Sequence, residues 1–200
     1  MSALPQTSQT MTEAEYLELE RASEFKHEYV GGTVLAMTGA SRAHNLISVN
    51  VITTLKNQLR GQPCEVYPGD MRVKVEVTRL YTYPDISVVC GGARFADTAL
   101  DTLVNPTLII EVLSPSTERY DRGKKFQNYR ELESLQEYVL IAQDGARVEC
   151  YRRQANGIWE LRDASGLTAQ LELASVGCRL DLAEVYDQIT FGEAADEPPK

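Results

Sequence analysis

The stretches YPDISVVC (residues 83–90) and TLIIEVL (residues 107–113) decide the fold of this chain. Both are short and rich in Ile and Val, whose branched side chains pack well on a pleated surface, so both predict buried strands. Each carries one carboxylate, Asp85 at the start of the first and Glu111 near the end of the second. A buried carboxylate is costly unless it is paired, hydrogen-bonded or bound to a metal. The two therefore predict a divalent-metal site, with a turn residue at Asp85 and a buried ion pair at Glu111 as the alternative.

Length and composition bound the class of protein. The 200 residues are 43% hydrophobic and 24% charged, which is typical of a globular chain. We expect one domain over residues 11–190, with flexible tails at 1–10 and 191–200. No apolar run approaches the roughly 20 residues that span a bilayer. No secretory signal is recognisable at the first residues, so we expect a cytoplasmic protein with no membrane contact.

Charge and cysteine content narrow the class further. The net charge of −9 opposes a general coat for nucleic acid, because such proteins need excess Lys and Arg to displace counterions. A local basic groove that binds nucleic acid is still compatible with this net charge. The cysteines are too widely spaced for a zinc knuckle. We expect all of them to be reduced and structural, with Cys90 a small buried hydrophobe: Cys64, Cys90, Cys150 and Cys178.

Local signals predict the elements of the first quarter of the chain. Thr12 and Glu15 fit a capping box that begins a short helix ending near residue 21. Gly31-Gly32, between two apolar stretches, predicts an N-terminal hairpin over residues 26–37. Apolar residues at four-residue steps predict a long helix that ends near Gly61: Ile47, Val51, Leu55 and Leu59.

The remaining elements are mostly short strands. Valine alternates with charged residues at 71–77, which indicates a half-exposed strand. Asn156-Gly157 predicts a C-terminal hairpin. Asp181 and Glu184 have the spacing of a capping box at a short terminal helix. Strands are expected at residues 64–67, 71–77, 83–90, 107–113, 138–142, 147–153, 158–162 and 171–173, and helices at 117–133 and 181–186.

The helix expected at residues 117–133 is basic. Asp121, Lys125 and Tyr129 share one face, because four-residue steps return nearly to the same angle. Lys125 is placed to hold an attacking water or to neutralise charge on a phosphate in the transition state. Lys124 points about 100° away, and with Arg122 it is expected to meet solvent or the backbone of a nucleic acid. The alternative is a solvated face with a Lys125–Asp121 ion pair.

Two further side chains are candidates for the metal shell. His44, near the start of the long helix, could join it directly or through water, and a local hydrogen bond is the alternative. Glu28, in the N-terminal hairpin, could supply another carboxylate. As an exposed strand residue Glu28 needs no special role, and we favour that interpretation.

The sequence around these residues resembles a nuclease superfamily and, more closely, one family. The pattern of Pro84-Asp85 followed by Glu111-Val112-Leu113 resembles the PD-(D/E)XK superfamily. The chain is more closely similar to the Uma-two family of restriction-endonuclease-like proteins, over roughly residues 11–189. The stretches that carry this resemblance are His44, YPD at 83–85, EVLSPST at 111–117 and DRGKKF at 121–126.

The resemblance implies a fold and an activity. It implies a restriction-endonuclease-like α/β fold, with a mixed central β-sheet flanked by helices and extra N-terminal and C-terminal hairpins. It also implies hydrolysis of DNA that depends on Mg²⁺ (or Mn²⁺), with Asp85 and Glu111 as metal ligands on adjacent strands. Leu113 stands where the superfamily has a lysine, and Lys125 is the best match for a relocated one. Duplex cleavage needs two cuts, so a homodimer is expected.

Two other functions are compatible with the same residues. A binding or regulatory protein with a nuclease fold and no turnover would fit the acidic net charge and Leu113. A metal-dependent hydrolase of a small phosphate ester is the third alternative. Competition by oligonucleotides separates this last function from the first.

Overall fold

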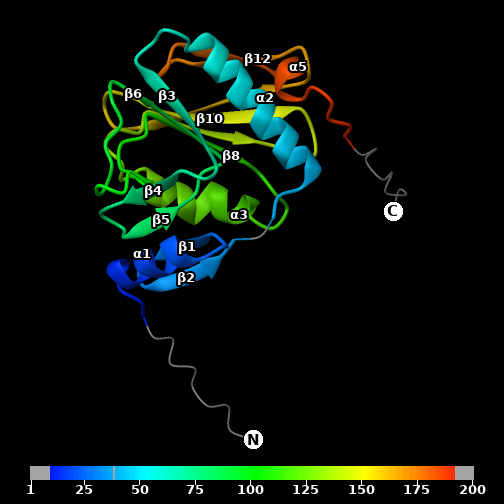
Figure 1. Ribbon diagram of the computed structural model, residues 1–200. Coiled ribbons are helices and arrows are strands. Elements are labelled where there is room, and N and C mark those ends of the chain that lie inside the picture. The colour runs from blue at the N-terminus through cyan, green and yellow to red at the C-terminus, as the bar shows by residue number, and fades with distance from the viewer. Residues whose placement is uncertain (1–9, 38, 192–200) are drawn as a thin grey trace, which may run out of the picture.

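A six-stranded sheet forms the centre of the molecule (Figure 1). The computed structural model describes residues 10–37 and 39–191, so most of the two expected tails lies outside it. The strand order is β11-β10-β9-β8-β6-β3, with β8 and β9 parallel and the other neighbours antiparallel. The mixed central sheet is therefore confirmed. Its strands are β3 (Cys64–Pro68), β6 (Ile86–Cys90), β8 (Leu108–Val112), β9 (Glu137–Ile141), β10 (Arg147–Arg153) and β11 (Trp159–Ser165).

One face of this sheet packs against the long helix α2 (Arg42–Gln58) and the C-terminal elements. The predicted apolar stripe of α2 is buried in this layer. Beside it lie β12 (Gln170–Leu173), β13 (Cys178–Asp181) and α5 (Leu182–Val185). Asp181 caps α5 by accepting a hydrogen bond from Ala183. Glu184 accepts a hydrogen bond from Thr54 of α2. This contact with a distant helix could not be predicted from the spacing of Asp181 and Glu184.

The other face is covered by a second, five-stranded sheet of order β2-β1-β5-β4-β7. The predicted N-terminal hairpin is confirmed as β1 (His27–Val30) and β2 (Thr33–Ala36), and it is part of this sheet. Helix α1 (Glu13–Ala22) has the predicted capping box and packs on the sheet through Tyr16, Tyr29 and Tyr81. The other strands are β4 (Arg72–Val75), β5 (Leu80–Thr82) and β7 (Thr102–Leu103). The last two are too short to show a period in the sequence.

The prediction of a half-exposed strand at residues 71–77 is wrong. Arg72 is only 2% exposed, because its guanidinium lies 3.0 Å from Asp101 and donates to Thr102 and Tyr83. Val77 lies beyond the end of β4 and is exposed. The alternation of charge therefore reports long-range ion pairing and not a solvent face.

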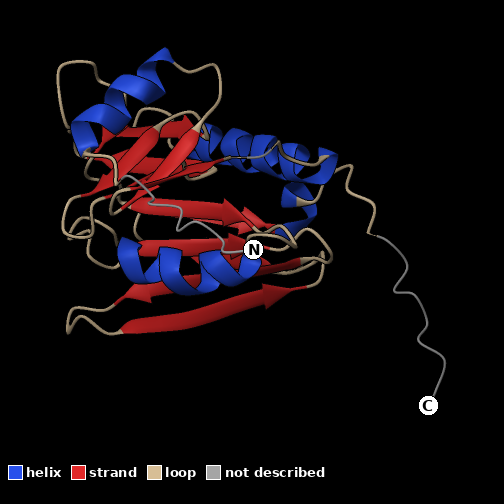
Figure 2. Ribbon diagram, turned by 90° about the horizontal axis from the view of Figure 1, so that it is seen from below, coloured by secondary structure: helices blue, strands red, loops and turns tan. Residues whose placement is uncertain are grey.

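A helical segment packs on the same face of the central sheet as the second sheet does (Figure 1), and Figure 2 shows the molecule from below. It consists of α3 (Glu118–Tyr120), a π-helical turn η1 (Asp121–Lys125) and α4 (Phe126–Tyr129). The prediction of a regular helix to residue 133 is therefore wrong. The expected core positions Phe126, Tyr129 and Leu132 are buried as predicted.

The expectation of four reduced cysteines is also wrong. Cys64 and Cys90 face each other where β3 pairs with β6, and they form a disulfide. Their sequence separation of 26 residues gives no local sign of this pairing. Cys150 and Cys178 are free and buried.

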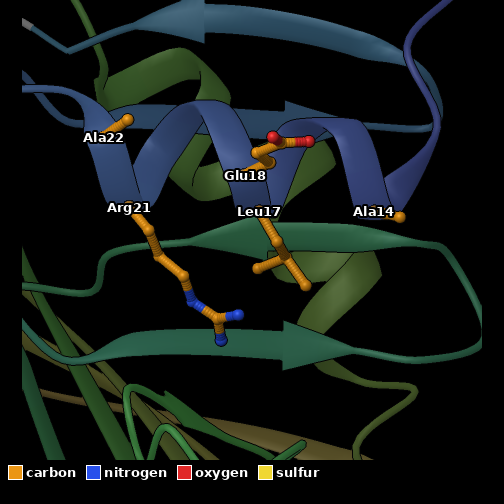
Figure 3. Close-up of a pocket in the computed structure, with 5 residues that line it drawn as sticks. All are labelled: Ala14, Leu17, Glu18, Arg21 and Ala22. Carbon is orange, nitrogen blue, oxygen red and sulfur yellow. The ribbon is translucent and has the colours of Figure 1, made fainter.

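A shallow hollow on the surface of α1 is lined by Ala14, Leu17, Glu18, Arg21 and Ala22 (Figure 3). Arg21 extends from the helix there and pairs with Asp97 and Asp101. Within the described residues, no helix has both the length and the apolar character to cross a membrane.

Candidate active site

The two strands predicted to carry Asp85 and Glu111 are neighbours, with Glu111 on β8 and Asp85 at the residue before β6. Asp85 directly precedes β6, and Ile86 pairs with Ile110 of β8. The backbone N–H of Val112 donates to Asp85 Oδ2 at 2.7 Å. Asp85 Oδ1 lies 2.8 Å from His44 Nε2, so α2 also holds this carboxylate. The structure thus places the histidine against a predicted metal ligand and not in a purely local hydrogen bond.

Lys125 reaches the buried carboxylate from the π-helical turn. Its Nζ lies 2.9 Å from Glu111 Oε1, 3.4 Å from Glu28 Oε1 and 3.6 Å from Asp121 Oδ1. The predicted Lys125–Asp121 pair is therefore the longest of three contacts. Tyr129 donates its hydroxyl to the same Glu111 oxygen at 2.9 Å. Asp121, Lys125 and Tyr129 thus face one cluster, as their four-residue spacing predicts.

The π-helical turn packs directly on the central sheet. Tyr138 of β9 donates its hydroxyl to the backbone carbonyl of Asp121 at 3.1 Å. Phe126 stacks on the same tyrosine, with 5.0 Å between ring centroids. π-Helical turns are rare in proteins, and those that occur are often found at functional sites. Here the wider turn is fixed from below by Tyr138 while Lys125 points at Glu111.

Glu28 is the member of the cluster that sequence reasoning misjudged. It was expected on an exposed strand face, but it is only 8% exposed and touches Lys125. Thr82 of β5 donates its hydroxyl to Glu28 Oε1. The reason is the second sheet, which brings β1 and β5 over the helical segment. Nothing local in the sequence indicates the roles of Thr82 and Glu28.

The cluster is strongly acidic. The carboxyl groups of Glu28, Glu111 and Asp121 contact the Lys125 ammonium, and the charge of Asp85 also acts on Glu111. These five groups have a net charge of −3 when all are ionised. Burial raises the pKa of Glu111 well above its ordinary value; Lys125 opposes this rise, and Asp121 and Asp85 add to it. Burial alone would lower the pKa of Lys125, but the carboxylates outweigh it and hold that pKa well above its ordinary value. Lys125 is therefore protonated at neutral pH.

The donor set fits a hard divalent cation. Carboxylate oxygens suit Mg²⁺ and Mn²⁺, and Mg²⁺ commonly takes one or two protein carboxylates and keeps several waters. Within the residues that the structure describes, no group of three His, Cys, Asp or Glu side chains is placed to hold a metal ion. Asp85 and Glu111, on adjacent strands in an acidic cluster, are the pair that fits such a partly hydrated ion.

The two predicted nucleic-acid contacts differ in their surroundings. Lys124 is exposed, while its neighbour Lys125 is buried. Arg122 is paired with Glu118 at 2.7 Å and with Glu149. The charge of Arg122 is therefore already compensated within the chain, and Lys124 is the freer of the two cations.

A comparison with family models identifies the family, and two relatives resemble most of the chain. The Uma2 family profile, described as "Putative restriction endonuclease", matches residues 13–183. The protein slr1290 of Synechocystis sp. (strain ATCC 27184 / PCC 6803 / Kazusa) is 37% identical over 177 residues, covering 88% of this chain and 92% of that relative. A second protein of that strain, sll1609, is 34% identical over 168 residues, covering 84% and 95%. Both relatives carry the description "Uncharacterized protein".

A solved structure supports the fold. The crystal structure of "a putative nuclease belonging to DUF820" from Anabaena variabilis ATCC 29413 superposes with a TM-score of 0.70. The match covers 88% of this chain and 98% of that one at 19% identity, so it bears on the fold alone. With the family match over residues 13–183, the conclusion is that this chain belongs to the Uma2 family and has a restriction-endonuclease-like fold.

Proposed function

We propose that the protein is a metal-dependent endonuclease that hydrolyses phosphodiester bonds of DNA, with Mg²⁺ or Mn²⁺ held by Asp85 and Glu111. The observation that carries the proposal is the position of the Lys125 ammonium, 2.9 Å from Glu111 and buried among carboxylates. Leu113 cannot compensate charge on a phosphate. A lysine from the following helix at this point supports its relocation from the strand.

The residues of the cluster divide the chemistry among them. A divalent ion bound there would polarise a phosphate oxygen and lower the pKa of a water molecule. His44 orients Asp85 through their 2.8 Å contact, and Tyr129 orients Glu111. Lys125 is kept protonated by its neighbours. Its positive charge stabilises the negative charge that develops on the phosphate in the pentacoordinate transition state. Lys124 contacts the DNA backbone from the exposed side of the same turn.

Supercoiled plasmid tests this function most directly. Wild-type protein at low salt is expected to nick the plasmid with Mg²⁺ or Mn²⁺ and not with EDTA. Glu111→Gln keeps the shape of the side chain and removes its charge, so we expect a loss of at least about 100-fold, as for removal of a preorganised electrostatic group. Glu133→Gln, an exposed carboxylate of the same region, is the matched control and should cut normally. Full activity in Glu111→Gln and Asp85→Asn would reject the assignment.

A second function is favoured by the net charge of −9 and by the ion pair that Lys125 makes with Glu111. It is a binding or regulatory protein that uses the nuclease fold without turnover. This function predicts that metal or DNA binds, measured by calorimetry or fluorescence anisotropy, while no substrate is cut with either metal. Metal-dependent nicking that Glu111→Gln abolishes would exclude it.

A further inference from the structure

The outer edge of β11 is open within the described residues, 10–37 and 39–191, where this strand pairs with β10 alone. Figure 2 shows β11 as the outermost strand of the sheet, along the lower border of the view. Leu161, within the strand, is 53% exposed, and Ile158, just before the strand, is 62% exposed. A seven-residue edge that shows large apolar side chains is a template for pairing with another strand.

The hydrogen bonds to β10 show which backbone groups of β11 face outward. Gln154 donates to the carbonyl of Ile158, and Gly166 donates to that of Ala146. In an antiparallel pair the bonded positions alternate, so the even-numbered residues of β11 bond to β10. The odd-numbered residues Trp159, Leu161 and Asp163 therefore present N–H and C=O groups to the open side.

The charges along this edge select one register for a second copy. In an antiparallel pair related by a two-fold axis at Leu161, each Leu161 lies opposite the other, and Glu160 lies opposite Arg162 of the second copy. Moving the axis by one residue places Glu160 opposite Glu160, or Arg162 opposite Arg162, and like charges directly opposite are destabilising. Within one chain Glu160 and Arg162 already lie side by side at 3.0 Å. In the Leu161 register, Glu160 and Arg162 of each copy therefore lie next to opposite charges both within the chain and across the pair.

We propose that β11 is a self-association edge, on which two copies of this chain pair antiparallel about Leu161 and join their six-stranded sheets into one. The outward backbone groups and the self-complementary charges identify a second copy as the occupant. This proposal does not depend on nuclease activity, because its readout is molecular mass and cross-linking. The opposite result would be a protein that stays monomeric because the charges on β11 prevent its pairing with another strand.

Charge exchange tests the register. In sedimentation or light scattering, the wild type should move with concentration from 22.3 kDa towards twice that mass. Glu160→Arg and Arg162→Glu should each weaken association by about tenfold, because each creates two like-charge contacts. A mixture of the two variants should associate again, since every contact across the mixed pair is then opposite in charge. A monomer at all concentrations, or no recovery on mixing, would overturn the proposal.

A cysteine pair gives an independent test of the same register. In Leu161→Cys the two thiols face each other across a hydrogen-bonded pair with about 5.5 Å between Cα atoms, within disulfide range. Mild oxidation should therefore cross-link this variant. In the matched control Asp163→Cys, the two cysteines are displaced by four residues, about 13 Å along the strand, and should stay monomeric on gels. Equal cross-linking of the two variants, or none in Leu161→Cys, would contradict this pairing.

Discussion

At the scale of single residues, two adjacent lysines have opposite surroundings. Lys125 is buried against three carboxylates, whereas Lys124 is exposed. The difference matters because removal of a buried lysine leaves its buried carboxylate partners with no opposite charge, which is strongly destabilising. The cluster therefore depends on one ammonium group for its stability as well as for its proposed chemistry.

Replacement of the two lysines separates these roles. Lys125→Met should lower the free energy of unfolding by about 3 kcal/mol and abolish metal-dependent cleavage. Because the cluster then has four carboxylates and no ammonium, Mn²⁺ should raise the melting temperature of this variant more than that of the wild type. Lys124→Met should unfold like the wild type and at most weaken DNA binding. Thermal unfolding with and without Mn²⁺ measures both variants, and similar behaviour of the two would contradict the cluster.

At the scale of elements, the N-terminal hairpin contributes directly to the candidate site. Glu28 of β1 contacts Lys125 of the π-helical turn, and Thr82 of β5 fixes Glu28 from the same sheet. The second sheet and the helical segment therefore meet at one carboxylate, and Lys125 links it to Glu111 of the central sheet. Burial of that charge is costly unless it is paired, and Lys125 supplies the partner.

Glu28→Gln tests this contribution. The amide can still accept the hydrogen bond from Thr82, but it removes one negative charge beside Lys125. We expect at least tenfold weaker metal binding, measured by calorimetry, with the fold retained by circular dichroism. Glu24→Gln, an exposed residue just before β1, is the control and should bind metal normally. Unchanged binding in Glu28→Gln would remove the hairpin from the site.

At the scale of the whole molecule, a disulfide ties the edge strand β3 to β6, the strand that follows Asp85. A cross-link over 26 residues restricts the unfolded chain and is worth about 3.5 kcal/mol in the chain-entropy account. The other two cysteines are unreactive for a different reason: burial raises the pKa of Cys150 to about 12, and burial also raises that of Cys178.

Thiol counting and unfolding test this arrangement together. Without reductant, the native chain should show almost no reactive thiol at neutral pH and the unfolded chain two; reduction should raise the second number to four. Labelling of native Cys150 should be slow at neutral pH, because the thiol is buried and only the thiolate reacts. Reductant should shift the denaturant midpoint of the wild type and leave Cys64→Ser/Cys90→Ser unaffected. Four reactive thiols without reductant would contradict the disulfide.

Local pattern was enough to predict much of this molecule. The capping box of α1, the Gly31-Gly32 hairpin and the apolar stripe of α2 depend on residues within a few positions of one another, so the sequence contains them completely. The same is true of the shared face of Asp121, Lys125 and Tyr129. The two carboxylate-bearing strands were expected side by side, and they are.

Tertiary structure alone decided the rest. The contact of His44 with Asp85, the burial of Glu28 against Lys125 and the Cys64–Cys90 bond join residues 26 to 97 positions apart. The second sheet decides the contact of Glu28, because β5 and β7 are too short to show a period and form only by pairing with β1 and β4. The packing of α2 decides the contact of His44, and the pairing of β3 with β6 decides the disulfide. The sequence by itself determined which segments could be strands and helices and that Glu111 would be buried, but not that Glu28 would be. Which of those charges meet is set by chain packing, since burial and pairing are properties of the assembled layers and not of any one segment.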